Sequence, residues 1–380
     1  MNIAGVAVES VPTESKWFVS KGFDYSLILG GAALTLALPV TVWAVPWLLP
    51  ILFWIWIIFF EGAHFFSTWT RTYMDRSFFS ENKPLLFGSL IFVVAPMFAA
   101  FLNMRMNSTA PLELYGFGLF CWSLYHNARQ HFGFVSIYLR KSHDGNIAIR
   151  NSILNSIYLA VVPPQIFFLL KFKLALAFPS ALIGYGHFLS TVASLTPVIS
   201  VIALFFIAKL YFSTRAGNKE RFPMHIAYTL GCLIFYATMF YWIAPREPFF
   251  QQAQNGAQMF MMIAVMNSLF HNIQYLAIVW VFGNRRASKK DSGPLVGLIH
   301  RKPFNYLMAC WIAGAGFAWI VWNLGDWTSP SGEWIQKQGH LWAIVIYFGI
   351  VGHHFFLDQR IWRVSRQREL QSALNLKEVT

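Results

Sequence analysis

The chain contains 380 residues, of which 56% are hydrophobic and only 12% are charged, and its mean hydropathy is +0.48. Soluble domains carry about a quarter charged residues, so this composition excludes a water-soluble globular protein and indicates an integral membrane protein. The formal net charge is +13. Lysines and arginines nevertheless gather between the apolar runs, as membrane topology requires, so we expect no nucleic-acid partner.

Segments of about 20 largely apolar residues, each long enough to cross a bilayer as a helix, recur along the chain. They predict an all-α, polytopic transmembrane helical bundle of about ten spans, which forms a single integral membrane domain over residues 1–380. The predicted spans are 25–44, 47–70, 84–103, 112–139, 153–171, 186–208, 224–245, 257–282, 305–325 and 340–360. Residues 1–23 form a predicted cytoplasmic N-terminal segment, and residues 361–380 a predicted cytoplasmic basic tail.

The distribution of basic residues predicts which side of the membrane each connection faces. With ten spans and a cytoplasmic N-terminus, 23 of the 29 lysines and arginines fall in cytoplasmic segments, five fall in outer loops, and Arg129 lies inside the fourth span. Cytoplasmic loops of membrane proteins carry such an excess of positive charge. The sequence therefore predicts that both termini are cytoplasmic.

Four of the predicted spans carry ionisable and amide side chains at membrane depth, where such groups are costly and face the protein interior or a water-filled cavity. The stretches are FFEGAH at 59–64, YHNARQH at 125–131, FHNIQY at 270–275 and GHHFFLD at 352–358. From the spacing to the next basic loop residue, their histidines lie roughly 9–21 Å from the cytoplasmic ends of their helices. Four helices thus carry histidines into the same half of the membrane.

This shared depth predicts a histidine-ligated metal site in the core of the bundle. The predicted metal ligands are His64, His126, His131, His271, His353 and His354. The side chains expected to support these ligands are Asn127, Gln130, Asn272, Gln274 and Asp358. The candidate catalytic residues are Glu61, Tyr125, Arg129 and Tyr275. For any single histidine, the alternative is a hydrogen bond between helices.

Helical spacing refines the predicted site. Glu61 and His64 are three residues apart, and His354 and Asp358 are four apart, so the members of each pair share a helix face. The histidines of the HNARQH stretch (126–131) are five residues apart, which separates them by about 140° around the helix. Either two metal ions, or one ligand and one supporting histidine, would fit this spacing.

Imidazole and carboxylate ligands without a thiolate suit iron, zinc or copper, and non-haem iron is the natural choice for O₂ chemistry. A site at membrane depth meets its substrate from the lipid. The sequence therefore predicts a metal-dependent membrane enzyme, a mono- or dinuclear iron oxidoreductase that acts on a lipophilic small molecule such as an acyl chain, sterol, quinone or carotenoid. The expected partners are membrane lipids and an electron-donor protein at the cytoplasmic face.

HNARQH (126–131) and the HH pair at 353–354 resemble fragments of the histidine boxes of membrane desaturases and hydroxylases, although the HxxHH boxes of that family do not occur in this sequence. The scattered histidines are similar to those of the membrane-embedded carotene-cleaving dioxygenases of bacteria and archaea. Both resemblances imply histidine-bound iron and a lipophilic substrate. HFFSTWTRTYMD (64–75) and HHFFLDQRIWR (353–363) resemble stretches of bacterial membrane proteins, which implies a multi-pass protein of the bacterial inner membrane.

Three alternatives remain open from the sequence. Histidines of facing helices could hold a haem as axial ligands in an electron-transfer protein. Glu61, Arg129 and the histidines could line the path of a transporter, although the polar groups gather on one side rather than across the midplane. The chain could also be a non-catalytic subunit of a larger membrane complex.

Overall fold

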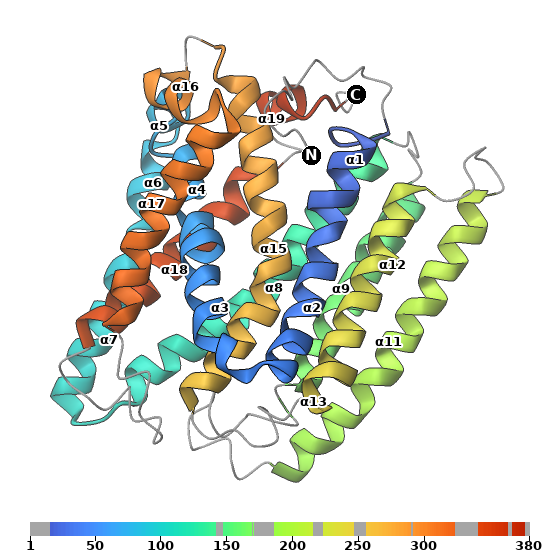
Figure 1. Cartoon of the computed structure of the whole chain (residues 1–380), viewed down its shortest axis with the longest axis horizontal. Helices are drawn as coiled ribbons and strands as arrows, with labels where there is room; N and C mark the ends of the chain where they lie inside the picture. Colours follow the sequence, from blue (N-terminus) through green and yellow to red (C-terminus); the bar gives the residue numbers. More distant parts are fainter. Residues whose placement is uncertain are drawn as a thin grey trace.

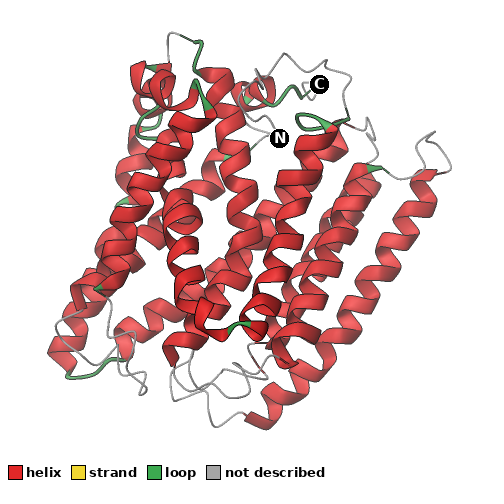
Figure 2. Cartoon of the chain, in the orientation of Figure 1, coloured by secondary structure: helices red, strands yellow, loops and turns green. Residues whose placement is uncertain are grey.

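The computed structural model describes residues 16–141, 147–168, 170, 186–215, 223–246, 256–289, 292–323, 341–363 and 367–376. Within these ranges the chain forms helices joined by turns and short loops, without any β-strand (Figure 2). The predicted all-α class is therefore confirmed. Parts of the predicted terminal segments, residues 1–15, 364–366 and 377–380, lie outside the described residues.

Eight helical segments in the described ranges are long and apolar enough to cross a membrane. The first three are Lys21–Ala44 (α1, Lys21–Phe23, and α2, Gly30–Ala44), Leu49–Arg71 (α3, Leu49–Trp56, and α4, Gly62–Arg71) and Lys83–Met106 (α6, Lys83–Ser89, and α7, Ile91–Met106). The next three are Ser190–Lys209 in α11 (Gly186–Arg215), Met224–Ile243, which starts with α12 (Met224–Ala237), and Val265–Arg286 in α15 (Gly256–Arg286). The last two are α17 (Pro303–Trp322) and α18 (Leu341–Ile361). Each overlaps one predicted span. Together they are compatible with a multi-pass integral membrane protein.

The two other predicted spans coincide with α8 (Ala110–Lys141) and α9 (Ile147–Phe168), continuous helices of 32 and 22 residues. Both belong to the same bundle, because α8 packs against α7, α9, α12 and α18, and α9 packs against α11 and α12. Among the described residues, eight helical segments meet the length and hydropathy expected of a membrane span, whereas the sequence predicts about ten spans. In α8, the polar stretch at 125–131 lowers the hydropathy of the helix.

Helices α4, α8, α15 and α18 carry the four polar stretches found in the sequence, and they meet inside the bundle. Helix α4 packs against α15 and α18, and α8 packs against the same two helices. Helix α15 lies in the middle of the bundle (Figure 1) and is the most buried of the eight apolar spans. Polar residues far apart in the chain are therefore brought to one interior region.

Two local features orient α4 for this role. A π-helical turn at Ile57–Glu61 joins α3 to α4 without a break, and its wider turn changes the direction in which Glu61 and the residues after it point. On the opposite face, an added methyl group on Gly62 would lie 2.7 Å from the Cα of Gly314 in α17. Small residues allow such close helix packing, which leaves the other face of α4 to α15 and α18.

Helices α1 and α19 (Arg368–Ala373) lie at the same end of the bundle, which we call the α19 end (Figure 1). At this end Arg286, the last residue of α15, pairs with Asp75 (Nε–Oδ2 2.7 Å) and with Glu369 of α19. The Arg286 side chain is fully buried. Because breaking a buried ion pair leaves an uncompensated charge, these contacts fix α19 and the segment around Asp75 against α15.

Candidate metal centre

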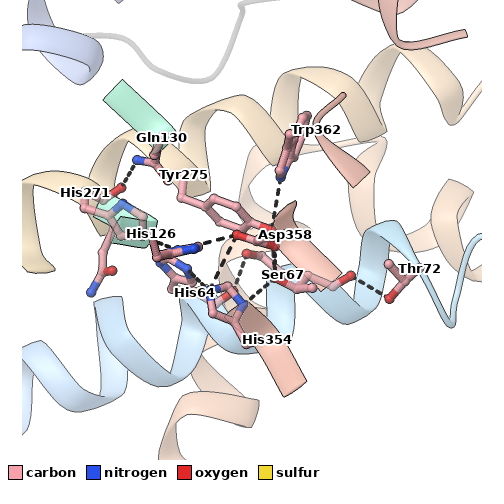
Figure 3. Close-up of polar contacts among 12 residues, drawn as sticks. His64, Ser67, Thr72, His126, Gln130, His271, Tyr275, His354, Asp358 and Trp362 are labelled. Atoms are coloured by element: carbon pink, nitrogen blue, oxygen red, sulfur yellow. Dashed lines mark hydrogen bonds and ion pairs between the residues drawn. The ribbon is translucent and has the colours of Figure 1, made fainter. Parts of the chain in front are cut away.

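Three histidines and one aspartate converge in the core of the bundle (Figure 3). His64 comes from α4, His126 from α8, and His354 and Asp358 from α18. Each offers one ligand atom, and the four atoms all lie within 4.8 Å of one another. All four side chains are buried. This is the size of the space that a single metal ion and its ligands occupy, with metal–nitrogen distances of about 2.0–2.1 Å for zinc.

The closest approach within the cluster is between two imidazoles. The Nε2 atoms of His64 and His354 are 2.6 Å apart. The Oδ2 of Asp358 lies 3.5 Å from the Nε2 of His354 and 3.8 Å from the Nε2 of His126. The four-residue spacing of His354 and Asp358 places both on one face of α18, as their spacing in the sequence predicts.

His271 of α15 adds a further imidazole beside this group. Its Nε2 lies 3.1 Å from the Nε2 of His126, and its ring stacks on that of His64 with a centroid separation of 4.7 Å. Four of the six predicted histidine ligands therefore meet in one place, from four different helices. With Asp358 they offer up to five donor atoms.

The donor set fits a metal cation. Imidazole nitrogens that face one another in a buried space carry lone pairs that repel unless a proton or a cation lies between them. Histidine nitrogen together with one carboxylate oxygen is a common environment for iron, zinc and copper. None of the three cysteines belongs to the group: Cys121 is exposed, and Cys232 and Cys310 are buried elsewhere.

Thr68 of α4 organises the cluster from its far side. Its Oγ1 donates to the Oδ1 of Asp358 (3.0 Å) and lies 2.8 Å from the Nδ1 of His354 and 2.7 Å from the hydroxyl of Tyr275. A hydrogen bond at Nδ1 fixes the ring orientation of a ligating histidine. Thr68 is not among the residues predicted from the sequence. Its position four residues after His64, on the same helix face, would have indicated that it belongs to the site.

Tyr275 of α15 lies directly against the predicted ligands. Its hydroxyl donates to the Oδ1 of Asp358 (2.5 Å), and its ring stacks on His64 at 4.2 Å with an interplanar angle of 7°. The indole Nε1 of Trp362 donates to the same hydroxyl at 3.4 Å. Tyr275 is the candidate catalytic residue that the structure brings closest to the cluster.

One side of the cluster opens into an apolar cavity of about 220 Å³. His64, His126, His271 and His354 line its polar wall. The apolar wall consists largely of Leu119, Phe120, Tyr347, Phe348, Val351 and Phe355. Hydrophobic walls with a few polar groups are typical of sites that bind apolar ligands.

Glu61 and Asn272 also line this apolar cavity. The Nδ2 of Asn272 donates to the Oε2 of Glu61 at 2.6 Å, so this half-buried carboxylate has an amide partner from α15. This partner differs from the pairing of Glu61 with Arg129 that charge alone would suggest. The guanidinium of Arg129 instead donates to the hydroxyl of Tyr158 (3.1 Å).

The other predicted amides hold α8 against α15. The Nδ2 of Asn127 donates to the carbonyl of Asn267 (3.0 Å), and the Nε2 of Gln130 donates to the carbonyl of His271 (2.8 Å). Gln130 also donates to Gln274 at 3.3 Å. These contacts position the backbone that carries His271 rather than touching the cluster itself.

The structure places His131 and His353 outside the cluster. His131 turns toward α12, where its Nδ1 lies 2.7 Å from the hydroxyl of Tyr228 and its Nε2 lies 2.9 Å from the hydroxyl of Tyr236. The five-residue spacing from His126 explains this, because it turns the two rings about 140° apart. The Nε2 of His353 instead lies 2.9 Å from the hydroxyl of Tyr73.

Tyr125 is also remote from the cluster. Its side chain is 46% exposed, on the outer surface of α8. Adjacent residues of a helix point about 100° apart, so the inward direction of His126 turns Tyr125 outward. The prediction of Tyr125 as a catalytic residue relied on its being next to His126 in the sequence, and the structure does not place its side chain in the site.

Comparison of the chain with known protein families, with curated proteins and with solved structures finds no match. The fold and the site define an all-helical protein, compatible with a multi-pass integral membrane protein, whose core contains a histidine–aspartate cluster that could hold a metal ion.

Proposed function

We propose that this protein is a membrane-embedded metalloenzyme, a non-haem iron oxidoreductase that acts on a lipophilic substrate. The observation that carries the proposal is the position of the cluster: its histidines form one wall of an apolar cavity of about 220 Å³. A metal ion at this wall would face whatever occupies the cavity. An apolar chain is the occupant that such a lining favours.

The ligand chemistry favours iron among the available metals. Two or more histidines with one carboxylate are typical of non-haem iron sites that leave positions open for other ligands. Iron held there would supply the oxidative chemistry that uses O₂. The cluster supports one metal ion held by His64, His126, His354 and Asp358, with His271 completing the set or supporting it.

The geometry favours non-haem iron over haem. Two axial histidines on opposite faces of a haem iron are separated by about twice a metal–nitrogen distance, or roughly 4 Å. The Nε2 atoms of His64 and His354 are only 2.6 Å apart. They are therefore better suited to neighbouring positions around a bare ion.

The remaining groups of the site have separate roles in this proposal. Tyr275 and Thr68 hold Asp358 in place through its Oδ1, which leaves Oδ2 directed at the histidines. Glu61, held by Asn272, is a polar group on the apolar cavity and would orient a polar end of the substrate there. A buried tyrosine–carboxylate pair is also a suitable place to hold a proton.

The proposed topology comprises ten spans, including α8 and α9, with both termini in the cytoplasm of a bacterial inner membrane. The proposal therefore makes the α19 end cytoplasmic. An oxygen-dependent enzyme needs a reductant, and the basic loops at this end would suit an acidic electron-donor protein. Accessibility of single cysteines at the α19 end to a membrane-impermeant reagent tests the orientation.

Metal analysis of adjacent histidines tests the proposed function. His354 belongs to the cluster, whereas the next residue in the chain, His353, contacts Tyr73 instead. The full-length protein would be purified in detergent, loaded with Fe(II) without oxygen, and analysed for bound iron. We expect about one bound iron per chain in the wild type and in His353→Ala, and a loss of most bound iron in His354→Ala.

A folded wild-type protein that retains no iron, zinc, manganese or copper would contradict the metal centre. Equal metal loss in His353→Ala and His354→Ala would contradict the assigned ligands. Oxygen consumption that depends on added lipophilic compounds, and that His354→Ala abolishes, would then extend the result from metal binding to catalysis.

A further inference from the structure

A second cavity, of about 170 Å³, lies on the other side of the cluster and differs in character from the apolar one. His126, Tyr275 and Asp358 form its inner end. Along α8 its lining runs from Gln130 to Arg140, a distance of about 15 Å toward the α19 end. His126 is therefore shared by two cavities, the apolar one and this second one, which has the more polar lining of the two and which we call the polar cavity.

The polar cavity is rich in positive charge. Arg129, Arg140 and Arg363 line it, and Asp358 is the single carboxylate among its described lining residues. Arginine presents a fork of donors that matches the oxygens of a phosphate or carboxylate. Three guanidinium groups that line one space can therefore present several donors to a bound oxyanion.

Side-chain amides add neutral hydrogen-bonding groups to the same lining. The Oε1 of Gln130 and the Nε2 of Gln359 are buried and have no hydrogen-bonding partner among the described residues. Buried polar atoms of this kind normally have a partner, and an unsatisfied one points to a missing ligand or water. A bound oxyanion can accept from an amide nitrogen, and a water or protonated group can donate to an amide oxygen.

Two of these arginines are held in place beside the cavity. Arg129 lies over the ring of Phe132 and donates to Tyr158, and the Nε of Arg363 donates to the carbonyl of Gln359 at 3.0 Å. The cavity volume accommodates several water molecules, and hence a group the size of a phosphate or carboxylate.

We infer that this cavity is an oxyanion-binding site, which takes the phosphate or carboxylate group of a co-substrate or of an amphiphilic lipid. The site goes beyond the proposed metal chemistry, because its arginines bind an anion whether or not the cluster holds metal. Its position beside His126 and Asp358 would bring the bound group to the edge of the cluster.

Binding measurements on the full-length protein in zwitterionic nanodiscs test this site. The probes are radiolabelled dodecyl phosphate, inorganic phosphate and uncharged dodecanol, measured by equilibrium dialysis against empty nanodiscs. Arg129→Gln and Arg363→Gln should each weaken binding of the anionic probe at least tenfold. Arg360→Gln is the matched control, because Arg360 lies on α18 just before Arg363, is exposed, and stands over the ring of Phe356.

The probes distinguish the source of the anion. Arginine-dependent binding of dodecyl phosphate alone would identify a lipid head group, whereas similar binding of inorganic phosphate would identify a free anion. Equal binding of dodecanol, an unchanged affinity in both cavity variants, or an equal loss in Arg360→Gln would overturn the inference. Metal content measured on the same samples separates the two proposals, because a metal-free protein that still binds the anion refutes only the metalloenzyme.

Discussion

The hydroxyl of Thr68 provides the sharpest test of how the cluster is held. Thr68→Val keeps the branched shape of the side chain but removes the atom that lies within 3.0 Å of Tyr275, His354 and Asp358. Asp358 retains the hydrogen bond from Tyr275. His354 loses its Nδ1 partner, so the substitution leaves one buried ring nitrogen unsatisfied.

The expected magnitude follows from that single loss. An unsatisfied buried polar group costs about 1–3 kcal/mol, which corresponds to about a 5- to 150-fold change in an equilibrium constant. Removal of a partner that orients a metal-binding histidine typically weakens metal affinity by about 10- to 100-fold. We therefore expect Thr68→Val to lower both thermal stability and metal affinity, the latter by about one to two orders of magnitude.

The assay is competition with a chelator of known affinity, with thermal unfolding measured in the same detergent. Thr70→Val is the matched control. Thr70 lies on the same helix and is also buried, but its hydroxyl donates within its own helix to the carbonyl of Ser67 (2.7 Å) and contacts no cluster residue among those that the structure describes. The proposed role of the Thr68 hydroxyl is refuted if Thr68→Val binds metal as tightly as the wild type, or if Thr70→Val loses as much metal affinity as Thr68→Val.

Three further predictions concern the surroundings of the site. His131→Leu should lower stability by about 1–3 kcal/mol, because it removes a hydrogen-bonding partner of the Tyr228 and Tyr236 hydroxyls. Bound metal per folded chain should not change, and a loss of bound metal would indicate that His131 is a ligand after all. Gly314→Ala should destabilise the protein by about 1–3 kcal/mol through overpacking against the π-helical turn at Ile57–Glu61 and the start of α4. Gly316→Ala should have little effect on the melting temperature, because the added methyl would meet no neighbouring helix among the described residues within 4 Å. Removal of metal by dialysis against a chelator should lower the melting temperature, and restored metal should recover it, because an ion that binds only the folded state stabilises that state. An identical melting temperature for the metal-loaded and metal-free protein would count against the centre.

Periodicity within single helices was readable from the sequence. Runs of about 20 apolar residues predicted helices that the structure contains, and the four-residue spacing of His354 and Asp358 predicted their common face. The cost of polar groups in hydrocarbon then selected the right helices, because side chains such as those of His64 and His271 must turn inward. These inferences need only the geometry of one helix and the properties of the membrane.

The relative rotation of the helices could not be read in this way. His353 and His354 are adjacent and chemically identical, and only the packing of α18 against α4 and α8 determines that His354 faces the cluster. The same holds for His126 and His131, whose five-residue spacing sends them to different neighbours. Side chains of one helix cannot reveal which face meets which partner.

From the sequence alone it follows that this is an all-helical protein with apolar spans, four of which carry clusters of ionisable and amide side chains. Which of these groups meet depends on the tertiary structure. It brings Thr68 into contact with His354 of the cluster and Asn272 into contact with Glu61, and it leaves one cavity on each side of His126. The physical reason is that helix formation and burial depend on local pattern and solvent. Convergence within a few ångströms depends instead on how side chains of distant segments pack against one another.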